Sequence, residues 1–435
     1  VLKESGSNAY RCTHHPPTPE VLDMCDSIGM LVLDENRHLS SSEEGLKDLS
    51  AMLYRDRNHP SIFMWSLENE EAMQGTVMGA RIMETMVNVA HKIDPTRKVT
   101  AAMNHARNEG GYSDVLDVVG YNYGDKQMAY VKDKEAHPDR VMFCTEGTSF
   151  VSTRGEYENS WWKHTCSNST LWQPGWGPYP GEDWADIVKY PYLGGTFVWT
   201  AFDYRGEPTP FVWPSVASQF GFLDVCGFPK DGYYAYKSAW SDILTVHIFP
   251  HWNWPGKEGD SIKVHCYTNC EEVELFLNGK SVGKQKAIPY AKLIWPLIYQ
   301  PGKLEARGYK AGKLVTKDIV ETTTAPAQVA LNSDVSTLKA DGCDVAIIKV
   351  AIKDAKGRVV PTADNLVKFS IDGPGKIIGV ANGNPNSHEA DKASQRMAFN
   401  GYCMVLVQPD RQAGDIHLKA VSEKLKSSEV TIKVE

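Results

Sequence analysis

The sequence predicts a multidomain protein with an α/β part and an all-β part: a (β/α)8 TIM barrel lacking its first strand, followed by two immunoglobulin-like β-sandwiches. Three observations support this prediction. The 435 residues are enough for two to four domains. Up to about residue 240, short apolar segments alternate with amphipathic helices, as in parallel α/β proteins. After Trp240, apolar and polar residues alternate in short runs, which is typical of antiparallel sandwiches.

The first strands and helices follow one another in regular order. Residues 8–11 predict the end of a strand, and Thr18 with Pro19 predicts the start of a helix that Gly29 ends. The next elements are a strand at 30–34, a helix with Leu46, Leu49 and Leu53 on its inner face, a strand at 62–66, a helix from 77 to about 93, and strands at 98–102, 117–121, 141–145 and 196–200.

These segments give seven parallel strands, whereas a (β/α)8 barrel needs eight. The chain starts at Val1, without an initiator methionine, directly before its first strand. We therefore expect that the first barrel strand and further N-terminal domains belong to a longer protein of which this chain is a part.

The all-β part divides into two predicted domains. Alternating segments at 261–267, 272–277 and 304–309, with an Asn278-Gly279 turn, predict a first sandwich. A linker at 322–326 separates it from a second series that includes 344–354, 367–371 and 415–421. The predicted domains are therefore a barrel at 1–240, a β-sandwich at 241–322 and an immunoglobulin/invasin-like sandwich at 325–435.

Composition excludes several classes of function. The chain has 46 Lys+Arg against 54 Asp+Glu without blocks of like charge, so a nucleic-acid partner is not expected. There is no run of about 18 apolar residues, which argues against a membrane span. The nine cysteines include no CxxC pair, so neither a disulfide framework nor a zinc knuckle is expected.

Polar side chains mark the carboxyl ends of the predicted strands, where parallel barrels place their active sites. Arg11 and His14 follow the first strand, and Glu146 and Trp199 stand at the ends of the last two. The other strands end in Asp34-Glu35, in Asn69-Glu70 and in 121–123. Two carboxyls held by separate strands suit glycoside hydrolysis, which needs one acid/base and one nucleophile or base.

The spacing of these motifs resembles glycoside hydrolase family 2, the family of β-galactosidases, β-glucuronidases and β-mannosidases. The resemblance covers about residues 1–240. It is carried by four segments in consistent order: Asn8-Ala9-Tyr10-Arg11-Cys12-Thr13-His14, Trp65-Ser66-Leu67-Glu68-Asn69-Glu70, Phe143-Cys144-Thr145-Glu146 and Gly195-Thr196-Phe197-Val198-Trp199. The two sandwiches are similar to the modules that follow the barrel in bacterial members of the family.

The resemblance implies a role for each candidate. Glu70 would be the acid/base and Glu146 the nucleophile, and Asn69 would bind the sugar 2-hydroxyl. The other implied substrate-binding residues are Arg11, His14, Tyr123 and Trp199. Simpler interpretations remain open, because Arg11 and Glu146 could form a structural ion pair and Trp199 could belong to the core. Glu68 and Glu71 are interpreted as solvated or structural.

Departures from the family pattern refine these expectations. The magnesium-binding Glu-x-His of some bacterial β-galactosidases is not matched, so no metal and no cofactor is expected. The Asn-x-Lys of β-glucuronidases is not found, which favours a retaining exo-β-glycosidase acting on β-galactosides. A β-mannosidase- or β-glucuronidase-type activity, or an inactive fragment or binding scaffold, remains the alternative. A periplasmic or secreted location is expected by analogy, and the sequence leaves a homo-oligomer open.

Overall fold

The computed structural model describes residues 1–105, 110–124, 129–170 and 182–435. It forms two compact units. The first comprises Val1–Phe150, Gln173–Thr200 and Ala239–Asp242, and the second comprises Val151–Trp172, Ala201–Ser238 and Ile243–Glu435. The bounds of the three predicted domains remain a prediction.

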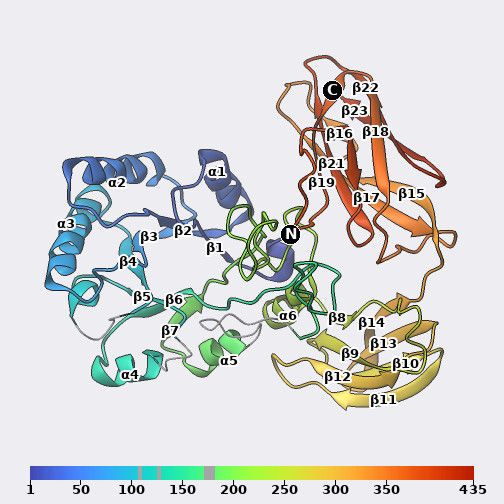
Figure 1. The fold of residues 1–435 in the computed structure, drawn as a ribbon. Helices are drawn as coiled ribbons and strands as arrows, with labels where there is room; N and C mark the ends of the chain where they lie inside the picture. Colours follow the sequence, from blue (N-terminus) through green and yellow to red (C-terminus); the bar gives the residue numbers. More distant parts are fainter. Residues whose placement is uncertain (106–109, 125–128, 171–181) are drawn as a thin grey trace. The chain divides into compact units, whose positions relative to one another are not determined.

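The first unit contains a parallel sheet whose described strands pair in chain order (Figure 1). The strands are β1 (Ala9–Arg11), β2 (Leu31–Glu35), β3 (Ile62–Asn69), β4 (Lys98–Met103), β5 (Val119–Asn122), β6 (Met142–Glu146) and β7 (Leu193–Thr196). Its helices are α1 (Pro19–Ile28), α2 (Glu43–Asp56), α3 (Val77–Ile93), α4 (Ala129–Ala136) and α5 (Glu182–Lys189), with 3-10 turns η1 (Lys3–Ser5) and η2 (Gly111–Asp114). The prediction of seven parallel strands is confirmed.

Local sequence sets the helix ends that return the chain to the sheet. Helix α1 starts with Pro19 and stops at Gly29, whose positive φ of 65° suits glycine. Ser42 and Thr76 cap α2 and α3, because each side-chain oxygen accepts a hydrogen bond from the backbone three residues on. The inner faces of α1–α3 pack with strand residues in one core, which includes Leu22, Leu49, Met83, Val32 and Trp65.

The last strand differs from its prediction. It spans Leu193–Thr196 instead of 196–200, because regular pairing with β6 ends at the Cys144–Thr196 pair. Residues beyond it continue beside the loop after β6, where Trp199 forms an isolated parallel bridge with Ser149. Trp199 therefore still lies beyond the carboxyl end of this part of the sheet.

The second unit contains the first predicted sandwich. One sheet has the order β12 (Leu293–Ile298), β9 (Ser261–Thr268), β8 (Val246–Phe249). The other has the order β11 (Lys280–Lys286), β10 (Glu272–Leu277), β13 (Lys303–Lys310), β14 (Lys313–Glu321). Residues from both sheets share one core, and Asn278 and Gly279 both have positive φ, as the predicted hairpin turn requires. Helix α6 (Asp231–Trp240) precedes this sandwich in the chain.

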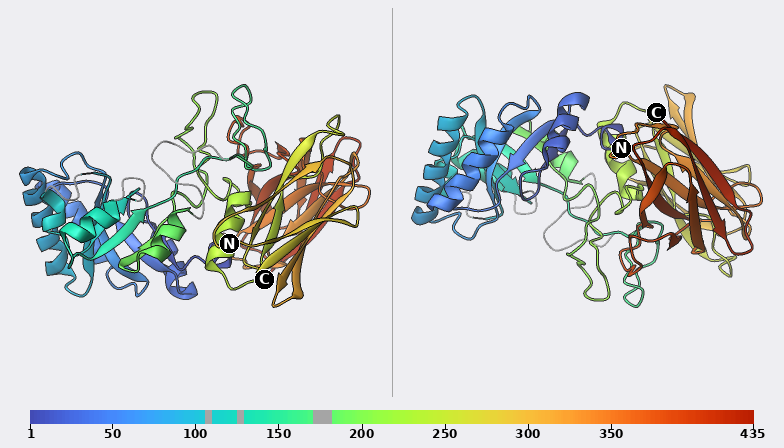
Figure 2. Two further views of the ribbon diagram at one scale, coloured as in Figure 1. Left: turned by 90° about the horizontal axis from the view of Figure 1, so that it is seen from below. Right: turned by 90° about the horizontal axis from the view of Figure 1, so that it is seen from above.

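The second sandwich follows, and its orange to red strands run alongside one another in Figure 2. Its first sheet has the order β15 (Pro326–Ser333), β17 (Ala346–Asp354), β21 (Tyr402–Pro409), β19 (Gly375–Ala381). Its second sheet has the order β16 (Thr337–Leu338), β23 (Ser428–Val434), β22 (Gly414–Ser422), β18 (Leu366–Asp372), β20 (Gln395–Met397). A shared aliphatic core joins the two sheets, so the predicted fold class is confirmed.

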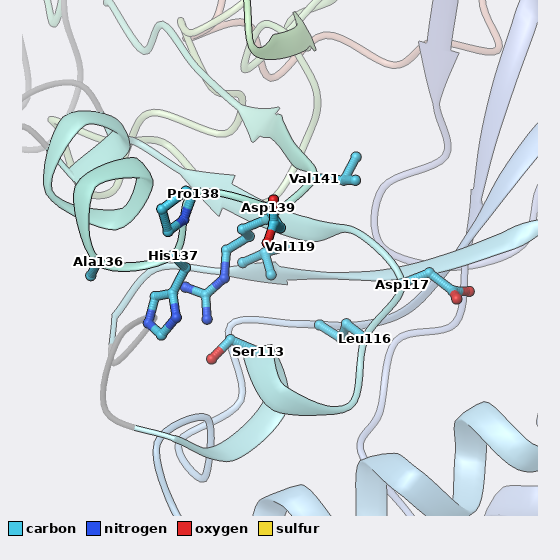
Figure 3. A pocket seen from close by; sticks show the side chains of 10 residues that line it. Ser113, Leu116, Asp117, Val119, Ala136, His137, Pro138, Asp139 and Val141 are labelled. Carbon is cyan, nitrogen blue, oxygen red and sulfur yellow. The ribbon is translucent and has the colours of Figure 1, made fainter.

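A cavity lies beside the sheet of the first unit. It has a volume of about 470 Å³ and lies at the amino ends of β5 and β6, between η2 and the end of α4 (Figure 3). Its lining includes Ser113, His137 and Arg140.

Among the described helices, none is long and apolar enough to cross a membrane.

Candidate active site

Arg11 is the centre of a buried polar cluster at the carboxyl ends of the strands. It is the last residue of β1 and is 6% exposed. Its Nη1 donates to Glu146 Oε2 at 2.8 Å and to the carbonyl oxygen of Thr145 at 2.9 Å. Its Nη2 donates to Asn69 Oδ1 at 2.7 Å, and its Nε donates to Glu35 Oε2 at 2.8 Å. One guanidinium thus connects the ends of β1, β2, β3 and β6.

Glu146 closes β6 and is 6% exposed. Its Oε1 accepts a hydrogen bond from the Tyr123 hydroxyl, while its Oε2 faces Arg11. Burial raises the pKa of Glu146, Arg11 opposes this shift, and the nearby charge of Glu70 adds to it. Burial and the Glu146 carboxylate also raise the pKa of Tyr123, so its phenol remains a hydrogen-bond donor.

Asn122 joins the two candidate catalytic carboxyls. Its Nδ2 lies 2.9 Å from Glu70 Oε1 and 3.4 Å from Glu146 Oε2. These two contacts limit the separation of those oxygens to about 6.3 Å at most. Nδ2 also lies 3.2 Å from Asn69 Oδ1, and the Asn122 side-chain oxygen accepts from Thr145 Oγ1 at 2.8 Å. The two carboxyls therefore face one shared space.

The backbone is unusual where Glu70 and Tyr123 leave their strands. Both residues have φ of 54°, in the left-handed region that residues other than glycine seldom occupy. Glu70 is held there by a hydrogen bond from its N–H to the Ala102 carbonyl, and Tyr123 by one to the Glu146 carbonyl. Such conformations cost about 1–3 kcal/mol and concentrate at functional sites. They turn each side chain toward the cluster.

His14 and Trp199 form an aromatic pair beside this cluster. Their rings are stacked, with centroids 5.1 Å apart and an interplanar angle of 8°. His14 Nδ1 lies 2.8 Å from Glu35 Oε1, which connects the pair to Arg11. Trp199 is half-buried. An exposed part of such a face offers a flat apolar surface against which a sugar ring can pack.

Glu68 differs from its interpretation as a solvated residue. It is fully buried, and its Oε2 accepts a hydrogen bond from the Glu71 N–H at 2.8 Å. No hydrogen-bond partner is found for its Oε1 among the described atoms. Burial raises the pKa of Glu68 well above its ordinary value, and the charges of Glu35 and Glu71 contribute further. The interpretation of Glu68 as a solvated residue is therefore wrong, and the structural interpretation remains a prediction.

One group of three metal-ligating side chains stands out among the described residues. It comprises Asp23, Asp26 and His59, beside the amino ends of the strands. Asp26 is already engaged, since its carboxylate takes hydrogen bonds from the His59 ring and the Ser61 N–H. The group is therefore explained as a structural cluster. The expectation of no catalytic metal remains a prediction.

Comparison with known proteins identifies the family to which this arrangement belongs. The family model described as "Glycosyl hydrolases family 2, TIM barrel domain" matches residues 1–137, and "Glycoside hydrolase family 2 C-terminal domain 5" matches residues 329–431. A domain of unknown function (DUF4982) matches residues 259–316. The chain belongs to glycoside hydrolase family 2.

Individual relatives are similar over most or all of the chain. β-Galactosidase BoGH2A of Bacteroides ovatus is 38% identical across 100% of this chain and 58% of its own length. A putative β-glucuronidase of Formosa agariphila is 32% identical across 88% of this chain and 40% of its length. The crystal structure of a β-glycosidase from Bacteroides vulgatus superimposes with a TM-score of 0.88 at 33% identity, covering 100% of this chain and 60% of that one. The chain thus spans about half the length of these relatives.

The family 2 barrel brings all the predicted site residues into one connected cluster. Hydrogen bonds connect six of them, partly through Glu35 and Asn122, and Trp199 joins by stacking on His14. The six are Arg11, His14, Asn69, Glu70, Tyr123 and Glu146. Their individual roles remain predictions, and Glu146 lies beyond the residues that the barrel model matches.

Sequence reasoning missed three members of the cluster. Asn122 and Glu35 both end a strand, and both belong to segments that strand-end polarity had already marked. Neither was selected as a site residue, because the sequence does not show which of several adjacent polar side chains points inward. The buried hydroxyl of Ser66, 2.9 Å from Glu35 Oε2, was missed for the same reason.

Proposed function

We propose that the chain carries the catalytic site of a retaining exo-β-glycosidase that hydrolyses terminal β-galactosides. One observation carries the proposal: a single amide nitrogen of Asn122 reaches both Glu70 and Glu146. Carboxyls in retaining enzymes stand about 5–5.5 Å apart, whereas inverting enzymes separate them by about 6.5–9.5 Å to admit a water. The limit of about 6.3 Å between the two oxygens supports the retaining class.

In the first step, Glu146 attacks the anomeric carbon and Glu70 gives its proton to the departing glycosidic oxygen. The products of this step are a covalent glycosyl-enzyme and the released alcohol. In the second step, Glu70 removes a proton from water, which attacks the same carbon and frees Glu146. Two inversions at that carbon retain its configuration.

The surroundings of Glu146 serve both steps. Arg11 and Tyr123 donate to its two oxygens, so the carboxylate is oriented before attack and is stabilised again when it departs. Asn69 is held by Arg11 and remains adjacent to Glu70, where it is placed to bind the 2-hydroxyl of the sugar. Contacts of this kind strengthen in the transition state and therefore raise the rate of glycosyl transfer.

The choice of sugar rests on similarity to known relatives. The Bacteroides ovatus relative is a β-galactosidase, which favours a galactoside. The Formosa agariphila relatives named as β-glucuronidases make a glucuronide the second candidate. Among the described residues of the cluster, the guanidinium of Arg11 is already committed to three side chains. A sugar carboxylate would need a cation other than Arg11, and Arg37 donates to the Asn69 carbonyl beside the cluster. The choice of galactoside therefore rests on the Bacteroides ovatus relative.

The test is covalent trapping with a slow 2-fluoro β-galactoside, followed by intact mass and peptide mapping. We expect one sugar adduct on the peptide that contains Glu146, and none on the Glu146→Gln variant. The same measurement is made with fluoro-glucuronide and fluoro-mannoside, and with the chain extended by any further residues that its gene encodes. An adduct on another carboxylate would overturn the roles, and turnover with inverted product would overturn the mechanism. Two further expectations remain predictions: that the enzyme removes the terminal sugar of its substrate, and that it is periplasmic or secreted.

A further inference from the structure

Glu35 is a buried carboxylate at the centre of the cluster to which the proposed mechanism gives no role. It is the last residue of β2 and is fully buried. Its Oε2 accepts from Arg11 Nε at 2.8 Å and from Ser66 Oγ at 2.9 Å. Its Oε1 accepts from Arg11 Nη2 at 3.1 Å and lies 2.8 Å from His14 Nδ1. Both oxygens are occupied by protein donors, so Glu35 cannot itself bind the sugar.

We propose that Glu35 is the positioning residue that holds Arg11 and His14 in the arrangement needed for glycosyl transfer. This inference rests on the proposed function. Glu35 acts through these two side chains: Arg11 contacts Glu146, and His14 stacks on Trp199 beside the cluster.

The contact with Arg11 fixes the plane of the guanidinium. Glu35 binds Nε and Nη2 in a two-pronged arrangement, which is the geometry that the planar fork of arginine favours. Nη1 is then directed at Glu146 Oε2 and the Thr145 carbonyl. A lysine or a freely rotating arginine could not serve these acceptors at once. The orientation of the nucleophile is therefore set partly from β2.

The contact with His14 fixes which ring nitrogen carries hydrogen. Burial alone would raise the pKa of Glu35, but Arg11 and His14 outweigh it and the net shift is downward. An ionised carboxylate only accepts hydrogen bonds, so His14 Nδ1 must be the donor. In the neutral ring, Nε2 is then an acceptor for a sugar hydroxyl. Stacking on Trp199 keeps the ring in this orientation.

The charge of Glu35 also acts on the nucleophile. Glu146 is faced by Arg11 from β1, His14 from the loop after β1, Glu70 from the end of β3 and Tyr123 from the end of β5. Glu35 shares Arg11 with Glu146, as the two salt bridges of 2.8 Å show. Without the Glu35 charge, Arg11 would attract the Glu146 carboxylate alone. The Glu146 carboxylate would then form at lower pH.

The test compares Glu35→Gln, Glu35→Asp and the wild type in kcat and KM across pH, with an activated aryl β-galactoside. For Glu35→Gln we expect kcat to fall at least about 100-fold and the acid limb of kcat/KM to move to lower pH. For Glu35→Asp, which keeps the charge but shortens the side chain, we expect a lower kcat and an unmoved acid limb. The aspartate variant also serves if the glutamine variant does not fold.

Asp94→Asn is the matched control, because it removes another buried carboxylate that binds an arginine but lies outside the cluster. It should leave both the acid limb and kcat unchanged. The positioning role alone would be overturned if both Glu35 variants kept a kcat within threefold of the wild type. It would also be overturned if Asp94→Asn shifted the acid limb of kcat/KM as far as Glu35→Gln does. An inactive wild type on every glycoside tested would overturn the proposed function and this inference with it.

Discussion

The two ends of the parallel sheet treat their carboxyl groups in opposite ways. At the amino ends, Asp94 binds Arg97, Trp65 Nε1 and both the N–H and hydroxyl of Thr96. Asp117 similarly binds His91, Lys98 and the Val99 N–H. Burial works to raise the pKa of both carboxyls, but these donors lower it, and for Asp94 the result is about 2. The charges there are fully compensated.

At the carboxyl ends the compensation is incomplete. Glu35 and Glu146 share one arginine, and Glu70 lies beside them. The pKa of Glu35 is lowered, while burial raises the pKa of Glu146 despite Arg11. Perturbed pKa values of this kind cluster at functional sites, whereas a carboxyl paired with cations of its own stabilises the fold. Burial of charge alone therefore does not mark a site; here the site is where three carboxyls, Glu35, Glu70 and Glu146, surround one arginine.

The largest expected effect is a loss of activity at the carboxyl ends of the strands. Replacing Glu146 with Gln keeps the shape of the side chain but removes the nucleophile, so kcat should fall at least about 10⁴-fold. Stability should not fall, because burial already disfavours the Glu146 charge. The measurements are steady-state kinetics and thermal unfolding. A variant that retained a tenth of wild-type kcat would contradict the assignment of Glu146.

The next effect concerns stability at the amino ends. Arg97→Met would leave Asp94 buried without its cation, and would also remove hydrogen bonds to the carbonyls of Ile62, His59 and Arg57. Breaking one side of a buried pair costs about 3–5 kcal/mol. Denaturant unfolding should show this loss, while kcat per folded molecule stays within about twofold. A large loss of kcat with unchanged stability would reverse our interpretation of the two ends.

A smaller effect follows from pH. The pKa of Asp94 is about 2, below its unfolded value of 3.8, so its stabilisation is present above about pH 4 and disappears as pH falls toward 2. At 1.36 kcal/mol per pKa unit, Asp94→Asn should cost about 2 kcal/mol at pH 7 and little at pH 2. Denaturant unfolding from pH 2 to 7 measures the difference. A cost independent of pH would mean that geometry, and not charge, matters there.

Much of this comparison could be predicted from the sequence. Parallel strands and capped helices have strong local signals, and strand ends converge whatever the details of packing. Arg11, Glu70 and Glu146 were therefore identified from their place at strand ends. The sequence could not show that Asn122 bridges two carboxyls or that Glu35 binds Arg11, since these contacts join positions 24 to 53 residues apart. It also could not show that Glu68, one residue before Asn69, points away from solvent.

Glu68 gives the reverse pH dependence. Its folded pKa is raised, so the folded state binds a proton more tightly than the unfolded chain, and stability declines as pH rises above about 4.5. Glu68→Gln keeps the acceptor for the Glu71 N–H but needs no proton. We expect it to stabilise the protein at pH 7, where the buried carboxyl of the wild type must be kept protonated or be ionised without a cation. The gain should vanish below pH 4, and Glu71→Gln, at a partly exposed neighbour, should show no such gain. Opposite pH slopes for Glu68→Gln and Asp94→Asn would establish the contrast between the ends by equilibrium unfolding alone, independently of any substrate.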